Sequence, residues 1–304
     1  MHIKYSALVL GFACLAATSP AYANHNEWHR HVLAGANFYT QGKYTQAEKE
    51  LDEALKEAKA FGKADPRLAI SLNQLGLVYL EQERYKDAEL LFKEALAVRE
   101  KTLGPKHIDT ATTMDNLAAV YDAQGNYKAA EETSRRALAI KEHTLGPNHP
   151  EVAATLDNLA GICEMQGKCD EAEKLCQRAM AISKKDPKSP EFANSLCHLA
   201  GMCVNRDKLS EAEVHYKHAL AIDEKSLGPD HPAVARDLNN LAGIYVRGEK
   251  YADAEPLCKR ALSIREKTLG VDSPEAIESR KNYAALLQQL GKKSTPPSTE
   301  AQGK

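Results

Sequence analysis

The sequence predicts an all-α fold, a solenoid built from antiparallel helix pairs. One observation is self-similarity: related segments start at Gln74, Asn116, Asn158, His198, Asn240 and Asn282, in steps of 42, 42, 40, 42 and 42 residues. A constant period of this length is typical of solenoids, in which each repeat is one supersecondary unit. The second observation is that apolar and small residues recur at helical spacing on both sides of a turn within each period. Each repeat is therefore expected to be a pair of helices.

The composition agrees with a soluble folded chain. Of the 304 residues, 43% are hydrophobic and 27% are charged, which is typical of a globular protein. Lys+Arg 40 against Asp+Glu 42 leaves a formal net charge of −2, without the basic excess that binding to nucleic acid or an anionic membrane requires. The chain has only one Trp and five Phe, so we expect helices that pack closely through small residues.

Residues 1–23 have the pattern of a secretory signal peptide. Lys4 supplies the positive start, an apolar run covers Ala7–Ala17, and Ala21-Tyr22-Ala23 is a small-x-small cleavage site. The run is about half of the roughly 20 residues that a membrane-spanning helix needs. We expect cleavage after Ala23 and export to the periplasm or out of the cell; the alternative is a retained anchor.

The repeat array is expected to occupy residues 24–290, beginning with a degenerate first repeat over residues 26–63. The third repeat shows the full pattern: Gln124-Gly125-Asn126 forms the turn, and Leu145-Gly146-Pro147-Asn148-His149-Pro150 connects to the next pair. Gly supplies a left-handed C-cap, and Pro fits the first helical turn. The same start signal, with conventional N-cap side chains, occurs at Asp65-Pro66, Ser189-Pro190 and Ser273-Pro274.

Small residues are predicted to set the distance between the two helices of a repeat. Alanines pair across the turn as Ala118 with Ala130, Ala160 with Ala172, Ala200 with Ala212, and Ala242 with Ala254. The array is expected to end in a single capping helix over Pro274–Leu290, because a terminal repeat needs a polar outer face. Residues 291–304 contain almost nothing apolar, so we predict a disordered tail.

This pattern resembles the tetratricopeptide repeat, in the 42-residue version found in kinesin light chain. The resemblance covers about residues 31–290 and is carried by the segment 254–270 and by Leu-Gly-Pro-x-His connectors at Leu103, Leu145 and Leu227. It implies a right-handed solenoid whose first helices line a concave groove. The fourth repeat departs from the pattern, because its connector Lys185–Pro190 is two residues shorter.

No catalytic or cofactor motif is found, so we expect neither an enzyme nor a cofactor. His107, His149 and His231 occupy one connector position in different repeats, which favours a contact with the backbone over a shared metal. His25 and His29, with His31 close by, are expected to lie on a solvated face, so no metal site is predicted.

Six cysteines follow the signal peptide, and five of them lie in the fourth and fifth repeats. Cys176 and Cys258 occupy the position of Phe92 and Tyr216, which favours a buried apolar role. Cys163 and Cys169 replace a Tyr pair that brackets the turn in other repeats. An exported chain meets oxidising conditions, so a disulfide between these two cysteines is the alternative to two separate thiols.

The resemblance places a peptide-binding groove on the first helices, where an Asn often bonds the backbone of an extended peptide. The candidate residues are Asn73, Gln74, Asp115, Asn116, Asp122, Asp157, Asn158, Glu164, His198, Asn205, Arg236, Asn239, Asn240, Arg247 and Asn282. Candidates in the third and fourth repeats are acidic, whereas those from the sixth repeat onward include arginines and Lys281. We therefore expect a polar peptide with its basic part toward the third and fourth repeats.

The sequence thus predicts a non-catalytic module that binds a protein or peptide, with no nucleic-acid partner and no membrane span. A structural alternative is a self-assembling scaffold of an envelope or secreted complex, acting through its convex face or its ends.

Overall fold

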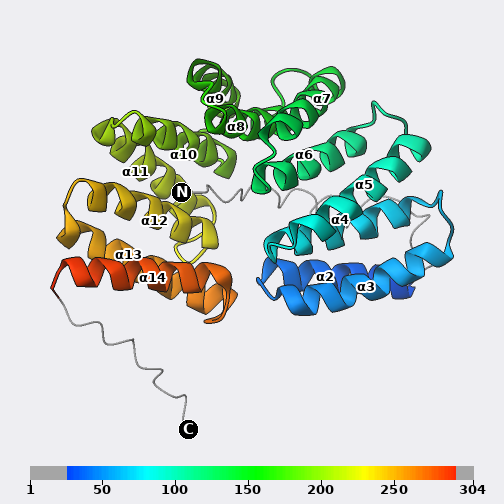
Figure 1. Cartoon of the computed structure of the whole chain (residues 1–304), viewed down its shortest axis with the longest axis horizontal. Helices are drawn as coiled ribbons and strands as arrows, with labels where there is room; N and C mark the ends of the chain where they lie inside the picture. The colour runs from blue at the N-terminus through cyan, green and yellow to red at the C-terminus, as the bar shows by residue number, and fades with distance from the viewer. Residues whose placement is uncertain (1–25, 292–304) are drawn as a thin grey trace, which may run out of the picture. The chain divides into compact units, whose positions relative to one another are not determined.

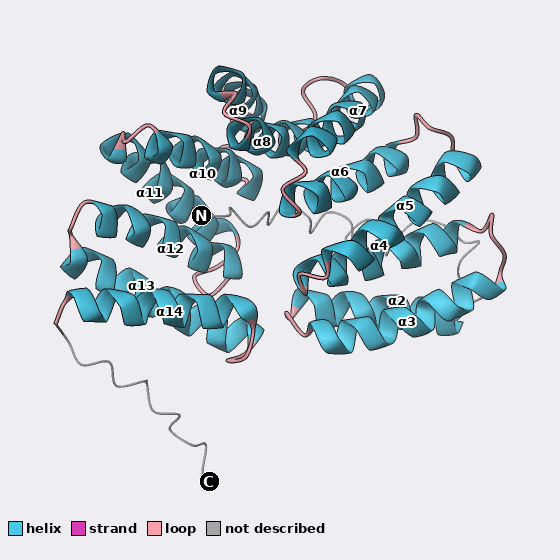
Figure 2. Cartoon of the chain, viewed as in Figure 1, coloured by secondary structure: helices cyan, strands magenta, loops and turns pink. Residues whose placement is uncertain are grey.

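The computed structural model describes residues 26–291; the predicted signal peptide and residues 292–304 of the predicted tail lie outside this range. The described chain is all-α, with helices and connecting loops and no strand in residues 26–291 (Figures 1 and 2). Its helices are α2 (Asn26–Thr40), α3 (Tyr44–Ala60), α4 (Pro66–Glu81), α5 (Tyr85–Thr102), α6 (Ile108–Ala123), α7 (Tyr127–Leu145), α8 (Pro150–Met165), α9 (Cys169–Ser183), α10 (Pro190–Asn205), α11 (Leu209–Ser226), α12 (Pro232–Arg247), α13 (Tyr251–Leu269) and α14 (Pro274–Gln289). The predicted fold class, a solenoid of helix pairs, is confirmed.

The chain divides into two compact units, residues 1–202 and 203–304, with the division inside α10. In the first unit, α2 packs on α3, α4 on α5, α6 on α7 and α8 on α9, and the second helices α3, α5 and α7 also pack on the first helix of the next pair. The first helices contact one another in the series α2, α4, α6 and α8. In the second unit, α12 packs between α11 and α13, and α14 covers α13 without a partner helix of its own among the described residues.

Small residues lie where the two helices of a pair cross, as the sequence predicted. Ala130 and Ala172 are fully buried, and Ala118 and Ala160 are 2% exposed. The second repeat has Gly76 in this position, and a Cβ atom added there would lie 2.8 Å from the Phe92 ring. Close packing leaves no room for a larger side chain at these crossings.

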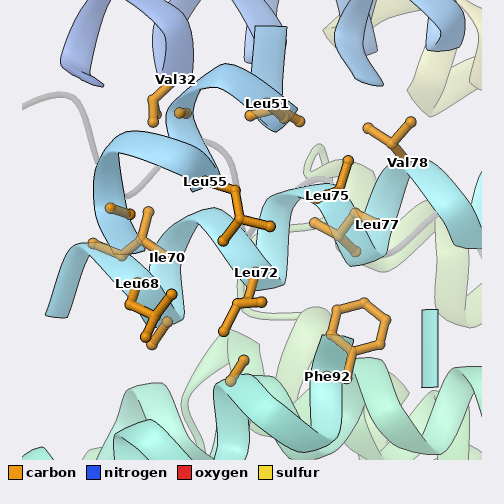
Figure 3. Close-up of a cluster of buried hydrophobic side chains, with 14 of the residues drawn as sticks. Val32, Leu51, Leu55, Leu68, Ile70, Leu72, Leu75, Leu77, Val78 and Phe92 are labelled. Atoms are coloured by element: carbon orange, nitrogen blue, oxygen red, sulfur yellow. The ribbon is translucent and has the colours of Figure 1, made fainter. Parts of the chain in front are cut away.

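The core of the first three repeats is a continuous layer of aliphatic side chains. Figure 3 shows Leu51 and Leu55 of α3 facing Leu72 and Leu75 of α4, with Phe92 of α5 beneath them. The position of Phe92 is taken by Cys176 in the fourth repeat and by Cys258 in the sixth, and both cysteines are buried. The burial that the sequence predicted for these two cysteines is confirmed, although Cys176 also contacts the Asp157 carboxyl.

The connectors also match the prediction. Gly146 has φ 87°, a left-handed conformation that glycine adopts without steric cost. The imidazole Nδ1 of His149 accepts a hydrogen bond from the Glu151 backbone N–H at 3.2 Å, so this histidine caps α8. His107 and His231 cap α6 and α12 in the same way. Their predicted structural role is confirmed.

The turn inside each repeat requires one residue in the left-handed region. Gly125 fills this position in the third repeat, with φ 75°. Glu83, Asp207 and Glu249 fill it in other repeats, with φ 61°, 59° and 58°. Residues with a Cβ atom pay about 1–2 kcal/mol for this conformation, so these repeats contain local backbone strain.

Candidate protein-interaction surface

The predicted groove residues all lie on first helices, but they differ in accessibility. Asn73, Gln74, Asn116 and Asp157 are buried, with 1–4% of their surface exposed. Half-buried side chains are Asp115, Asp122, Asn158, Glu164, His198, Arg236, Asn239 and Asn240, and exposed ones are Asn205, Arg247 and Asn282. The last two sets contain the residues that a partner could reach without movement of the helices.

The amides of the second and third repeats contact each other rather than solvent. Asn116 Nδ2 of α6 donates a hydrogen bond to Asn73 Oδ1 of α4 at 3.0 Å. Gln74 is 1% exposed, and neither atom of its amide has a hydrogen-bond partner. Helix α4 is enclosed because both α2 and α6 pack against it. The sequence predicted that these three amides would be exposed in the groove, whereas the structure buries them.

Asp115, which directly precedes Asn116 on α6, is half-buried and belongs to an ion-pair network around the buried Lys141. Its carboxylate lies 2.7 Å from Lys141 Nζ and accepts a hydrogen bond from Thr155 Oγ1 at 2.9 Å. Lys141 also lies 3.5 Å from Glu151. Burial lowers the pKa of Lys141, but the two carboxylates outweigh this effect and raise the pKa above its ordinary value of 10.5. The network joins α6, α7 and α8 through charges that face each other.

Asp157 is one repeat after Asp115, but its surroundings are different. Its carboxyl accepts hydrogen bonds from Ser195 Oγ at 2.7 Å and, more weakly, from Cys176 Sγ at 3.8 Å. No described cation contacts it, because Ser183 replaces Lys141 in this repeat and bonds its own helix at Ala179. Burial raises the pKa of Asp157 from 3.8 to about 7. This carboxyl is thus poised to lose or gain its charge near neutral pH.

In the second unit, polar pairs again join successive repeats. Asn239 Nδ2 of α12 donates to Ser279 Oγ of α14 at 3.0 Å, and Arg265 Nη1 of α13 donates to the same hydroxyl at 2.9 Å. Arg236 is ion-paired with Asp237 at 3.0 Å and with Asp223 at 3.3 Å. The guanidinium of Arg236 is therefore already paired with two carboxylates of its own unit.

Arg247 is the more accessible of the two predicted arginines. Its guanidinium is 47% exposed and lies 3.2 Å from Asp207, and it also donates a hydrogen bond to the Val204 carbonyl at 3.0 Å. An exposed ion pair of this kind is weak, so the side chain can exchange partners.

Sequence analysis did not identify the buried cations of the second helices. Arg99, Lys141 and Arg265 occupy one repeat position, and each bonds groups of an adjacent first helix. These cations could have been found in the sequence, because a basic residue recurs at the same repeat position within an otherwise apolar stretch of α5, α7 and α13.

Cys163 and Cys169, the predicted disulfide candidates, lie on either side of the turn between α8 and α9. Cys163 is buried, and burial raises the pKa of its thiol to about 11. Cys169 is exposed at the first residue of α9. The disulfide stays a prediction.

A family profile for the tetratricopeptide repeat matches residues 28–101, 91–143, 123–185, 191–257 and 238–295. The chain belongs to the tetratricopeptide repeat family. Repeats of this family are generally protein-interaction modules, and the fold is typically non-catalytic. Within residues 26–291, no helix of this tetratricopeptide repeat protein is long and apolar enough to cross a bilayer.

The array is similar to several kinesin light chain proteins. It is 32% identical over 77 residues to Protein KINESIN LIGHT CHAIN-RELATED 3 of Arabidopsis thaliana, a match that covers 25% of this chain but 12% of that protein. A putative kinesin light chain of Podosopora anserina is 26% identical with a TM-score of 0.50, covering 67% of this chain and 98% of that one.

Two further solved structures share the fold alone. BtubC (BKLC) from P. vanneervenii has a TM-score of 0.57 at 24% identity, covering 73% of this chain and 91% of that one. The apo form of RapI has a TM-score of 0.58 at 12% identity, covering 87% of this chain and 99% of that one.

Proposed function

We propose that this tetratricopeptide repeat array is a non-catalytic adaptor that binds an extended segment of a partner protein along its first helices. The observation that carries the proposal is the repeated amide position in which Asn158, Asn240 and Asn282 are half-buried or exposed. An amide can donate and accept at once, which suits the alternating groups of a peptide backbone. Asn158 also has a buried Oδ1 without a hydrogen-bond partner.

The charges refine which part of the peptide goes where. Asp115 is paired with Lys141, and the other half-buried acidic candidates of the first unit are Asp122 of α6 and Glu164 of α8. Arg247 and Lys281 play the opposite role in the second unit. We therefore expect the first helices of the third and fourth repeats to favour a basic peptide segment, and α12 and α14 of the second unit to favour an acidic one. Such complementarity acts on orientation and association rate more than on final affinity.

The test uses the full chain and a partner captured with it from an envelope or secreted fraction, mapped to a peptide. Asn158→Ala and Asn240→Ala should each weaken binding by about 0.5–1.5 kcal/mol, the net value of one hydrogen bond. Charge reversal at Arg247 should slow association and change its salt dependence. Lys174→Ala, on the exposed face of α9, is the control and should change neither. Unchanged binding in both Asn variants would refute the proposed groove.

Self-assembly is the second candidate, favoured by exposed apolar side chains on second helices. Leu90 of α5 and Val214 of α11 occupy the same repeat position and are 67% and 65% exposed. Single exposed apolar side chains are common on folded proteins, so the case for self-assembly depends on whether this repeat position forms a contact between chains. Light scattering that shows association rising with concentration in the absence of any peptide, and lost in Leu90→Lys, would support the scaffold over the adaptor.

Export is also a proposal, supported by the sequence of residues 1–23. The exported product should begin at Asn24, which intact mass of protein purified from the cell envelope or the medium measures directly. A mass that includes Met1 would favour a retained anchor instead.

A further inference from the structure

The first helix pair contains a histidine enclosed by carboxylates from both of its helices. His31 of α2 has its Nδ1 2.7 Å from Glu50 Oε2 of α3. Its other ring nitrogen, Nε2, lies 4.0 Å from Glu27 Oε2, one turn earlier on α2. Arg30 Nη2 lies 3.2 Å from the same Nε2. The imidazole therefore has a carboxylate on one side and a guanidinium and a second carboxylate on the other.

These contacts select one tautomer of His31. A guanidinium can only donate hydrogen bonds, so Nε2 must accept and carry no proton. An ionised carboxylate can only accept, so Nδ1 carries the proton and donates it to Glu50. This is the arrangement that orients histidine as a metal ligand, in which a carboxylate holds one ring nitrogen and the other presents its lone pair.

Further ligand atoms converge on the ring of His31. One oxygen each of Glu27 and Glu57 and one ring nitrogen of His31 all lie within 4.8 Å of one another. Ligand atoms about 2.1 Å from a shared tetrahedral ion are about 3.4 Å apart, so a small side-chain rotation would bring these three into range. Glu27 and His31 are an i,i+4 pair on one helix face, and Glu57 approaches from α3.

The guanidinium of Arg30 interacts with three carboxylates near this histidine. Its hydrogen bond to Glu27 is the strongest of these interactions, and Glu50 and Glu57 act on it through their charges. Arg30 is hydrogen-bonded to Glu27 but its side chain is 60% exposed, so it can leave without opening the core. Removal of this guanidinium would uncover the Nε2 lone pair and the two carboxylates together.

We propose that Glu27, His31 and Glu57 form a site for a divalent first-row transition-metal ion such as zinc, with Glu50 as the residue that orients the imidazole. One nitrogen and two carboxylate oxygens are ligands that zinc accepts, with water completing the coordination. Arg30 occupies the position of the ion in the metal-free protein and moves into solvent when the ion binds. The site joins α2 to α3 at the first repeat and is independent of the proposed groove.

A second convergence of ligand atoms, from two carboxylates and a thiol, is less suited to a metal ion because cations already bond it. Glu131, Cys163 and Glu171 also lie within 4.8 Å of one another. There, however, Lys168, Gln166 and Arg135 all bond Glu131, and together they lower the pKa of this carboxyl to about 2 against the opposing effect of burial. Two cations already satisfy that cluster, and it holds no histidine.

The experiment is a titration of the full chain with Zn²⁺ by calorimetry, checked by competition with a chromophoric chelator. We expect one site that His31→Gln abolishes and that Glu57→Gln weakens at least tenfold. Glu50→Gln should weaken binding by about 10–100-fold, the effect of losing an outer-shell partner. His29→Gln, a histidine on the same helix outside the cluster, is the matched control and should leave the site unchanged. Circular dichroism should confirm that each variant keeps its helices.

Arg30→Ala separates this site from adventitious binding to a surface histidine. It should tighten Zn²⁺ binding, because the variant lacks the guanidinium that competes with the ion. Absence of a saturable site in the wild-type chain, equal loss in His29→Gln and His31→Gln, or an unchanged affinity in Arg30→Ala would each overturn the proposal.

Discussion

Asp157 makes the stability of the fourth repeat dependent on pH. Its carboxyl is 4% exposed and bonds only Ser195 and Cys176, so the protonated form is favoured in the folded chain. The pKa of this carboxyl is about 7 in the folded state, against an ordinary value of 3.8. Between these two values the unfolded chain has released the proton and the folded chain has kept it. The free energy of unfolding therefore falls as pH rises through this window.

The size of the effect follows from the width of the window. Each pH unit between the two pKa values changes the free energy of unfolding by about 1.4 kcal/mol, so the full effect is about 4 kcal/mol at most. The contribution of Asp157 is fully present below pH 4 and lost above pH 7. Asp157→Asn keeps an acceptor for Ser195 and has no charge to desolvate. We expect this variant to exceed the wild type in stability by about 1 kcal/mol at pH 4.5 and by about 4 kcal/mol at pH 7.5.

Urea unfolding of the full chain at several pH values between 4.5 and 7.5 measures this difference. Asp115→Asn is the matched control from the preceding repeat, where Lys141 neutralises the carboxylate. It leaves a buried ammonium with one partner fewer, so we expect it to destabilise the protein at pH 7.5, by about 3 kcal/mol. If the difference between Asp157→Asn and wild type is constant across the pH range, the reasoning about Asp157 is wrong.

Two further predictions concern packing and turns. Ala172→Leu should lower the free energy of unfolding by about 1–3 kcal/mol, because the buried crossing of α8 and α9 has no room for a larger side chain. Lys174→Leu, on the exposed face of α9, should change it by less than about 0.5 kcal/mol. Equal changes in urea unfolding for the two variants would contradict the assigned register. Glu249→Gly should raise the melting temperature, because glycine adopts the left-handed conformation without strain and the folded chain gains about 0.5–1 kcal/mol of stability. Gly125→Ala at the same turn position should lower the melting temperature. If calorimetry shows that Glu249→Gly lowers it or that Gly125→Ala raises it, the strain argument is wrong.

Local signals made the helices predictable from the sequence. Helix starts at Pro66, Pro190 and Pro274 follow from the residue before each proline and the missing proline N–H, which are properties of two or three adjacent residues. The capping helix was expected to end at Leu290 and ends at Gln289. The repeat period then fixed the order of packing, because each helix pair can bury its faces only against its neighbours.

The accessibility of the candidate groove could not be predicted in the same way. Asn73 and Asn158 occupy neighbouring positions in the repeat pattern. Asn73 of α4 is buried and accepts a hydrogen bond from Asn116 of α6, whereas Asn158 is half-buried. Which part of a first helix is covered depends on side chains one repeat away, and this information is spread over about 42 residues. Hydrogen bonds such as that from Ser195 to Asp157 span 38 positions and leave no mark in a local pattern.

The polar residues between repeats show that similar repeats need not behave alike. Lys141 and Ser183 occupy one repeat position, but the first provides a buried cation and the second bonds only its own helix. Asp115 is consequently paired with a lysine, whereas burial raises the pKa of Asp157, one period later, to about 7. The interior of the third repeat therefore contains an ion pair, and that of the fourth contains a carboxyl that titrates near neutral pH. The single exchange of Lys for Ser thus gives two successive repeats different electrostatic and stability properties on the same backbone.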